Sequence, residues 1–250
     1  MSAMRSVSTT FEVLDALAER QPVGVGELAR VLDLPKSTVQ RSLVVLHDSG
    51  WIRPWSTSGH TKWVLTVKPL TLAGYVLRGE RLLREAAAPI MAELGARTEE
   101  TIHLTVLDGD HVVLLDKVDS TQAVRTMSWI GGRVALNASA SGLAMLANLP
   151  PSRAEALELI RYTDASLVER SHLTALLDEI RECGYAINVG MWRADVSAVA
   201  AAVLGPSGDP IAAVSISMPS YRLTEERRTE YGELVVSAAR QIARDRFGDF

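Results

Sequence analysis

The sequence has almost no cysteine and no long hydrophobic run. Cys183 is its one cysteine in 250 residues, so no intrachain disulfide can form, which is typical of a cytoplasmic protein. No apolar stretch approaches the roughly 18 residues of a membrane span, and the first ten residues lack a hydrophobic signal core. We therefore expect a cytoplasmic protein without membrane contact. Free cysteine is usually buried, so we interpret Cys183 as an inert buried thiol.

Catalytic and metal-binding motifs are also missing. The sequence contains no HExxH, Walker loop, dinucleotide-binding glycine pattern or paired CxxC. The segment Asn137–Gly142 is the nearest approach to a nucleophile elbow, but it lacks the first glycine of GxSxG. Among five scattered histidines, His103 and His111 could face each other across a hairpin, which favours a structural pair because zinc-ligand spacing is absent. We expect no enzyme, no metal and no cofactor.

Positive charge is scarce overall but concentrated in one place. The whole chain has a net charge of −4. Residues 35–68 contain five basic side chains and one acidic, which makes this segment +4 and the remainder −8. A compact basic patch on an acidic chain is typical of a small DNA-binding module attached to a domain that does not bind DNA.

The basic patch begins in the segment Glu27–Leu43, which predicts two helices with a tight break. Asp33-Leu34-Pro35 interrupts the helical pattern, because the residue before proline avoids the helical region. The second helix starts near Pro35–Ser37 and has an apolar face of Val39, Leu43 and Leu46. Its polar face suits phosphates and base edges, so the pair is interpreted as a helix-turn-helix. A helix hairpin that binds nothing is the alternative.

The flanking segments favour the DNA-binding interpretation. Residues 7–20 predict a supporting helix that buries Val7, Phe11, Leu14, Leu17 and Ala18. A strand from Gly50 to Arg53, a turn and a second strand over Thr61–Val67 complete a winged helix-turn-helix, with Trp51 and Trp63 packed inward and Trp55 exposed. The residues predicted to contact DNA are Lys36, Ser37, Thr38, Gln40 and Arg41 from the second helix and Arg53, His60 and Lys62 from the wing.

The rest of the chain predicts an α+β domain with an antiparallel sheet and helices at its faces. We expect the winged helix-turn-helix over 1–67, a linker helix over 68–79 and the α+β domain over 80–250. The linker helix is too apolar to stand alone in water, so it should bury a face against another subunit. Pro89 should kink or divide the following helix. The expected strands are 102–106, 111–118, 123–129, 185–187, 196–204 and 211–218, and the expected helices are 139–148, 152–160, 169–183 and 224–246.

Several short motifs, in this order and spacing, resemble the IclR family of bacterial transcriptional regulators over essentially the whole chain. In the first part these are Glu27-Leu28-Ala29, Leu34–Val39, Arg41-Ser42-Leu43 and Gly50-Trp51-Ile52. In the second part they are Leu107–Asp110, Asp116-Lys117-Val118, Leu136–Gly142, Gly184-Tyr185-Ala186 and Ala212–Ser217. The Pro-Lys-Ser-Thr start of the recognition helix is the most specific of them.

The resemblance implies a regulator of double-stranded operator DNA that forms a homodimer or a dimer of dimers. It also implies a GAF-like effector domain that binds a small organic or aromatic acid. The implied effector-binding residues are Ala140, Ser141, Asn188, Ala198, Ser215 and Ser217. The residues themselves agree with this, because a helix start near 140–142 offers free N–H groups to a carboxylate and the two serines share one side of a strand.

The segment Asn188–Ala198 departs from the family pattern. Carboxylates expected after Gly-Tyr-Ala are missing, the expected cysteine is Ala198, and Met191 and Trp192 are added. A less polar pocket should suit a larger or more apolar ligand, and Arg193 is either a partner for its carboxylate or an exposed arginine. Two alternatives stay open: a regulator without effector response, and a C-terminal sensor or enzyme module whose helix-turn-helix is vestigial.

Overall fold

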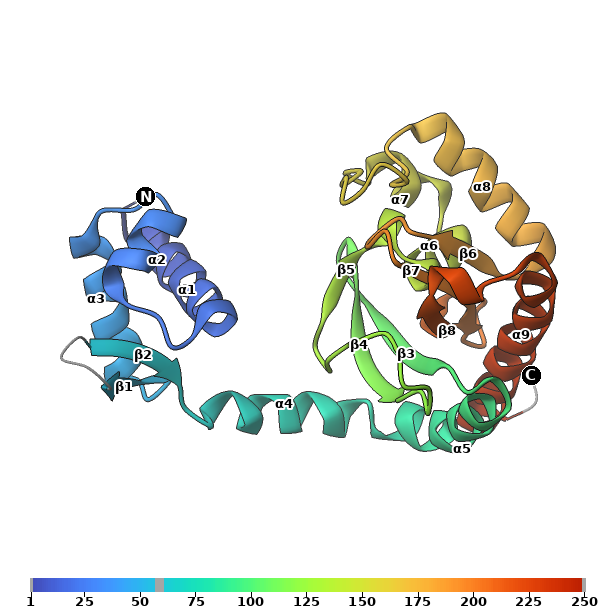
Figure 1. Cartoon of the computed structure of the whole chain (residues 1–250), viewed down its shortest axis with the longest axis horizontal. Coiled ribbons are helices and arrows are strands. Elements are labelled where there is room, and N and C mark those ends of the chain that lie inside the picture. The colour runs from blue at the N-terminus through green and yellow to red at the C-terminus, as the bar shows by residue number, and fades with distance from the viewer. Residues whose placement is uncertain (1, 57–60, 249–250) are drawn as a thin grey trace. The chain divides into compact units, whose positions relative to one another are not determined.

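The computed structural model describes residues 2–56 and 61–248, with side chains from Ser6 onward except that of Ser56 (Figure 1). The chain divides into two compact units, one ending at Gly79 and the other beginning at Glu80. Among the residues described, no helix combines the length and apolar character needed to cross a membrane.

The first unit is a winged helix-turn-helix. Its elements are α1 (Ser2–Arg20), α2 (Val25–Val31), α3 (Lys36–Asp48) and the antiparallel pair β1 (Ile52–Ser56) and β2 (Thr61–Leu65). The break between α2 and α3 is where the sequence predicts it, with Asp33 at a positive φ of 51° and Pro35 as the N-cap. Val39, Leu43 and Leu46 are buried, which confirms the predicted inner face of α3.

The inner face of α1 differs from the prediction. The helix starts at Ser2, and its buried apolar residues are Val13, Ala16 and Leu17. Leu17 is buried as predicted, but Val7, Phe11 and Ala18 are exposed, because the buried face of α1 is centred on Val13 and Ala16. The wing is as expected: Trp51 and Trp63 pack on the core, and Trp55 is exposed.

The helix α4 (Lys68–Gly79) ends at the predicted break before Glu80, and none of its residues is buried within its own unit. The next helix, α5 (Arg81–Thr98), is a single helix that contains Pro89. Of the two predicted effects of Pro89, division of the helix is excluded, because a lost hydrogen bond does not always end a helix, and a kink stays a prediction.

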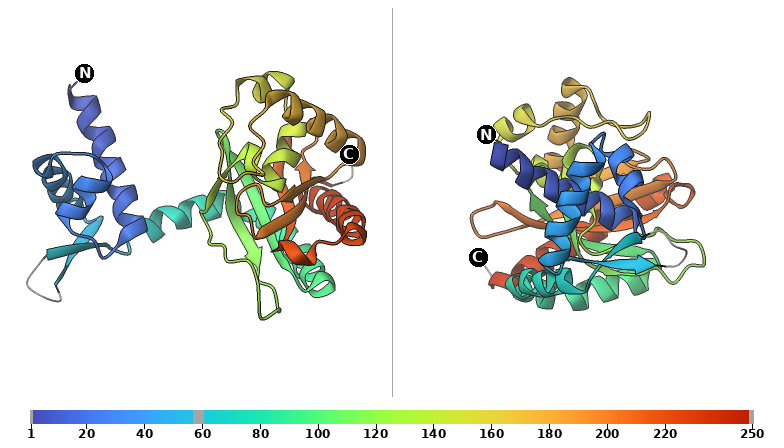
Figure 2. Two further views of the ribbon diagram at one scale, coloured as in Figure 1. Left: turned by 45° about the horizontal axis from the view of Figure 1, so that its top comes forward. Right: turned by 90° about the vertical axis from the view of Figure 1, so that its left-hand side faces the viewer.

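The second unit is built on a six-stranded antiparallel sheet in the order β5-β4-β3-β8-β7-β6. The pair α5 and α9 packs against one face, and α6 and α8 lie over the other (Figures 1 and 2). This confirms the predicted α+β class. The remaining elements are β3 (Thr101–Asp108), β4 (His111–Val118), β5 (Arg133–Ala135), α6 (Ala140–Ala147), α7 (Pro151–Ala156), α8 (Arg170–Cys183), β6 (Ala186–Val189), β7 (Val196–Leu204), β8 (Pro210–Pro219) and α9 (Glu225–Phe247).

Several predictions for this unit are wrong. Residues 123–129 form a loop with exposed Val124 and Met127, and the third strand is β5 instead. The helix expected over 152–160 stops at Ala156. Cys183 is exposed at the end of α8 and is not a buried thiol.

The two histidines of the β3–β4 hairpin do not face each other. His103 is opposite Lys117, and His111 is opposite Asp108. The hairpin register, including a bulge between Leu104 and Thr105, separates them. The described residues contain no cluster of three or more potential metal ligands.

Candidate functional site

A pocket opens between the start of α6 and the sheet face that carries α6 and α8. Its empty space, including the open mouth, is about 750 Å³. Sheet residues from β3, β8 and β7 form its floor, and most of its surface is apolar. All six residues predicted to bind an effector line it.

The start of α6 brings polar groups to this pocket. Ser139 caps the helix by accepting a hydrogen bond from the Gly142 N–H, at 3.0 Å. The N–H groups of Ala140 and Ser141 stand in the first turn, where a helix offers no backbone acceptor. The helix can pack this closely because of Gly142, where a Cβ atom would lie 2.4 Å from the carbonyl oxygen of Leu136.

Three serine hydroxyls also face this space. Ser141, Ser215 and Ser217 have 6%, 2% and 4% of their surface exposed, respectively. None of the three hydroxyls has a hydrogen-bond partner among the residues that the structure describes, yet all three residues line the pocket. The three hydroxyl oxygens are not among the described buried atoms that lack a partner, so they reach the open space of the pocket and are available to a ligand.

Asn188 and Ala198 form a wall of the pocket. The Asn188 amide donates to the Ala138 carbonyl at 2.6 Å and accepts from the Met191 N–H at 2.9 Å. Most of its polar capacity is therefore used within the protein. Arg193 is exposed, bonds Asp195 at 3.4 Å and is not among the lining residues, so it is a surface arginine here.

Other residues of the pocket were not predicted from the sequence. They include His103 on β3, and Ser128 and Trp129 from the loop before β5. Trp192, whose presence in the sequence predicts a less polar pocket, is also a lining residue. For His103 the sequence suggests only a structural histidine pair. The loop residues gave no signal, because only the tertiary fold brings them over β3.

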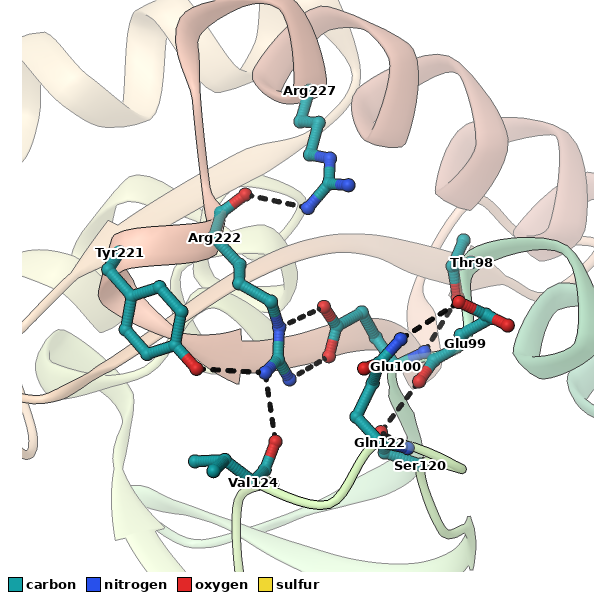
Figure 3. Close-up of polar contacts among 9 residues, drawn as sticks. All are labelled: Thr98, Glu99, Glu100, Ser120, Gln122, Val124, Tyr221, Arg222 and Arg227. Atoms are coloured by element: carbon teal, nitrogen blue, oxygen red, sulfur yellow. Dashed lines mark hydrogen bonds and ion pairs between the residues drawn. The ribbon is translucent and has the colours of Figure 1, made fainter.

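A buried ion pair fixes this loop. Arg222 makes two 2.6 Å bonds to the Glu100 carboxylate and donates to the Val124 carbonyl at 2.9 Å (Figure 3). The Glu100 hydrogen bond raises the pKa of Arg222 above its ordinary high value, so the guanidinium stays charged. This contact joins the end of β8 to the start of β3 and to the loop that carries Ser128 and Trp129.

In the first unit, α3 presents an uncommitted polar surface. Lys36, Ser37, Gln40 and Arg41 are exposed and Thr38 is half-buried. The described residues provide no hydrogen bond or ion pair for Lys36, Gln40 or Arg41. Side chains that form no hydrogen bond or ion pair within the protein are free to contact an anion or a base of another molecule.

The wing adds two cations to this surface. Arg53 is exposed and stacks over Trp55, with its guanidinium carbon 5.4 Å from the ring centroid. Lys62 is directly opposite Trp55 in the β1–β2 register, so it shares that face of the hairpin. His60, also predicted to contact DNA, lies outside the described residues.

A winged helix-turn-helix followed by an α+β domain with a small-molecule pocket defines a ligand-responsive class of DNA-binding transcriptional regulator. Comparison with known proteins narrows the class. Residues 6–54 match the IclR helix-turn-helix domain, and residues 78–244 match the bacterial transcriptional regulator IclR C-terminal domain. The chain belongs to the IclR family of bacterial transcriptional regulators, as its motifs predict.

Individual relatives match along nearly the whole chain. The HTH-type transcriptional regulator KdgR of Escherichia coli is 34% identical over 96% of this chain and 92% of its own length. The transcriptional repressor IclR of the same organism is 31% identical over 96% and 89%. The crystal structure of an IclR homologue from Microbacterium hydrocarbonoxydans, complexed with 4-hydroxybenzoate, superposes with a TM-score of 0.74 at 25% identity, covering 98% of this chain and all of the other.

Proposed function

We propose that this regulator binds a small aromatic monocarboxylic acid in the pocket of its second unit, and that this binding changes its affinity for operator DNA. The observation that carries the proposal is the set of three nearly buried serines beside the start of α6, Ser141, Ser215 and Ser217, whose unpaired hydroxyls reach the pocket. Hydroxyls and helix N-terminal N–H groups together favour a carboxylate.

The rest of the lining favours an aromatic body for this ligand. Trp129 and Trp192 line the pocket together with Val112, Leu114 and Val134. Aromatic and aliphatic walls gain most from a flat apolar ligand. The binding of 4-hydroxybenzoate by the Microbacterium homologue supports the same class of ligand.

Benzoate binding to the full-length protein, measured by isothermal titration calorimetry, tests this proposal. The double variant Ser215→Ala/Ser217→Ala should bind benzoate at least tenfold more weakly, because each hydrogen bond to a charged group contributes about 1.5–3 kcal/mol. Ser207→Ala is the matched control, since Ser207 is on an exposed loop and bonds Asp209. Equal affinities in all three proteins would refute the carboxylate site.

We propose further that α3 enters the major groove of DNA. Lys36, Ser37, Thr38, Gln40 and Arg41 would contact bases and phosphates there. Arg53, Lys62 and, by its position in the sequence, His60 would contact phosphate or the minor groove from the wing. The exposure and lack of internal partners of the α3 cations support this orientation.

Arg41→Ala is the variant that tests this DNA contact. In a gel-shift titration with a DNA site selected from a random pool, it should lose about 1–3 kcal/mol of binding free energy if Arg41 reads a base. If Arg41 contacts a phosphate instead, the variant should release about one counterion fewer when it binds DNA, so its DNA affinity should fall less steeply with salt concentration. Arg20→Ala, an exposed arginine at the end of α1, is the control and should bind as wild type. If Arg41→Ala binds DNA with the affinity and salt dependence of wild type, the assignment of α3 as the DNA-contacting helix is refuted.

A homodimer, or a dimer of dimers, is the oligomeric state that we propose. The helix α4 exposes Leu70, Leu72, Tyr75 and Val76, each by at least half of its surface. Exposure of these four apolar side chains to water is unfavourable, so this surface of α4 suits a subunit interface. Light scattering of the full chain should give a multiple of the 27.1 kDa protomer mass, and Val76→Glu should shift it toward the protomer.

A further inference from the structure

Another pocket of the second unit lies at the edge of the sheet, between the end of α8 and the second half of α9. Its empty space, including the open mouth, is about 1220 Å³. It shares no lining residue with the pocket proposed for the effector. We call it the edge groove and define it by six of its lining residues: Arg181 and Gly184 at the end of α8, Ala201 and Ala202 on β7, and Arg240 and Arg244 on α9.

The row of the sheet that β6 occupies is only partly filled at this place. The strand β6 pairs with β7 from Ser197 to Ala200 and no further. Before β6, the chain turns into α8 at Gly184, which has a φ of 84°. The described residues therefore place no strand beside Ala201–Leu204 on the side away from β8.

The edge groove meets β7 along its backbone. Ala201 and Ala202 both line it, although consecutive residues of a strand point their side chains to opposite faces. The surface that they share is the backbone edge. Alternate residues of an antiparallel strand direct both N–H and C=O to the same side, and no hydrogen bond between described residues reaches this side of Ala201–Leu204. The edge is open to another strand.

The charged residues of the edge groove are all arginines, as far as the structure describes its lining. Arg240 and Arg244 are four residues apart on α9, a spacing at which like charges repel each other. Neither has a carboxylate partner among the described residues, and Arg244 bonds only the neutral Gln241 side chain, at 2.6 Å. Arg181 pairs with Asp178 and donates to the Ala147 carbonyl at 2.7 Å, which fixes its position on the other wall.

The charge of these arginines contrasts with that of their surroundings. The second unit contains 17 basic and 24 acidic side chains, so it is negatively charged as a whole. Its acidic background would repel a negatively charged partner everywhere except at such a local positive site. The edge groove is therefore complementary to an anionic partner.

An open strand edge beside unpaired arginines favours an extended acidic peptide over a small anion. A phosphate could neutralise the arginines, but it has no N–H groups for the carbonyl oxygens of β7. An extended peptide offers alternating N–H and C=O groups to the edge and side chains to the walls. The four residues Ala201–Leu204 span about 13 Å of strand, and the half-buried Leu204 and Val236 provide apolar contacts beside it.

We propose that the edge groove binds an extended acidic segment of a partner protein. The segment adds to β7 beside Ala201–Leu204, continues the row that β6 begins, and places its carboxylates against Arg240 and Arg244. This site is separate from the proposed effector pocket and from the surface proposed to contact DNA, so it does not depend on either.

Fluorescence anisotropy with the full-length protein tests the proposal. The probe is a fluorescein-labelled peptide of four alternating glutamate–valine pairs, and we expect it to bind wild type saturably. The same peptide with glutamine in place of glutamate should bind at least about tenfold more weakly, because it lacks the charge. Two further peptides are N-methylated on all valines or on all glutamates. One of the two loses the N–H groups that face β7 and should also bind at least about tenfold more weakly.

Substitutions at the arginines locate the binding site. Arg240→Ala/Arg244→Ala should weaken binding of the probe at least about tenfold. Arg125→Ala/Arg161→Ala is the matched control, because it removes the same charge from exposed positions of the second unit outside the edge groove. The control should change the affinity by less than about twofold. In wild type, the probe should slow hydrogen exchange in peptides that cover residues 201–204.

Each contrary result overturns the proposal. If wild type does not bind the probe, the edge groove is not a site for an acidic strand. If the two double variants lose affinity equally, the probe responds only to net charge. If both methylated peptides bind as tightly as the probe and inorganic tripolyphosphate displaces it, the edge groove binds small anions and the addition of a strand to β7 is refuted.

Discussion

The ion pair between Glu100 and Arg222 allows a quantitative test of how this fold is held together. The Glu100 side chain is 2% exposed and that of Arg222 is 14% exposed, with two bonds of 2.6 Å between them. Glu100→Ala would leave the guanidinium without its carboxylate at a site that water barely reaches. It would keep only its bonds to the Val124 carbonyl and the Tyr221 hydroxyl (Figure 3).

The expected loss follows from the burial of the pair. Removing one partner of a buried ion pair costs about 3–5 kcal/mol of unfolding free energy, mostly because the other charge is left uncompensated. Arg222 retains some solvent exposure and two neutral partners, so we expect a value near 3 kcal/mol, the lower end of this range. In the double variant Glu100→Ala/Arg222→Ala the stranded charge is gone, and the loss should be smaller than the sum of the two single losses by about 2 kcal/mol.

The pair Arg84–Asp116 provides the matched control. Its bond is 2.9 Å long, and its side chains are 34% and 29% exposed. Solvent-screened pairs of this kind contribute about 0–1 kcal/mol, so the same double-mutant cycle should give a coupling energy below about 1 kcal/mol. Both cycles change one arginine and one carboxylate that join separate elements of the second unit.

Hydrogen exchange of the full-length protein, measured against urea in peptides from β7 and β8, reports the stability of the second unit separately from the first. Coupling energies that are equal for the two pairs would refute the reasoning, because burial would then have no effect on the value of the contact. A single-variant loss below about 1 kcal/mol for Glu100→Ala would refute it as well.

Other expected results concern the pocket. The folded-state pKa of His103 is about 4 against an ordinary 6.5, so the unfolded chain binds the proton first. Stability should therefore fall by about 3 kcal/mol as the pH drops through this window, and urea unfolding of His103→Asn should lack this part of the loss. Gly142→Ala should cost about 1–3 kcal/mol and weaken benzoate binding, because its Cβ would meet Leu136 at 2.4 Å. Gly74→Ala, at a position with open space around it, should be neutral or stabilising when the thermal melts of the two alanine variants are compared. Asn188→Asp should cost about 1–3 kcal/mol, because a carboxylate would replace the amide donor facing a carbonyl oxygen, and a calorimetric melt would contradict us if it matched wild type.

The sequence predicts the first unit well, because its information is local. The turn before Pro35 and the apolar spacing of α3 depend on neighbouring residues alone. The error in α1 has the opposite origin: Val7 and Phe11 look like core residues by periodicity, but the position of α3 selects Val13 and Ala16 for the core. Periodicity identifies an amphipathic face without saying which partner covers it.

The pocket was predicted in part for a similar reason. Ser215 and Ser217 are two apart on one strand, so their common orientation follows from the sequence. The loop over 123–129 has the composition of a strand, but its position is fixed by Arg222, which is about a hundred residues further along the chain. No local pattern could link these segments, so Ser128 and Trp129 were missed.

The neutral side chain of Asn188 has a consequence for the charge balance of the pocket. Its amide uses its polar atoms to hold Ala138 and Met191 in place. With His103 neutral and Arg133 already paired, the negative charge of a bound acid would face only dipoles: serine hydroxyls and the N–H groups at the start of α6. Dipoles can hold one carboxylate in a largely apolar site, but they cannot compensate two. The neutral lining of the pocket thus restricts the number of carboxylates on the ligand, while the two tryptophans favour a larger ring.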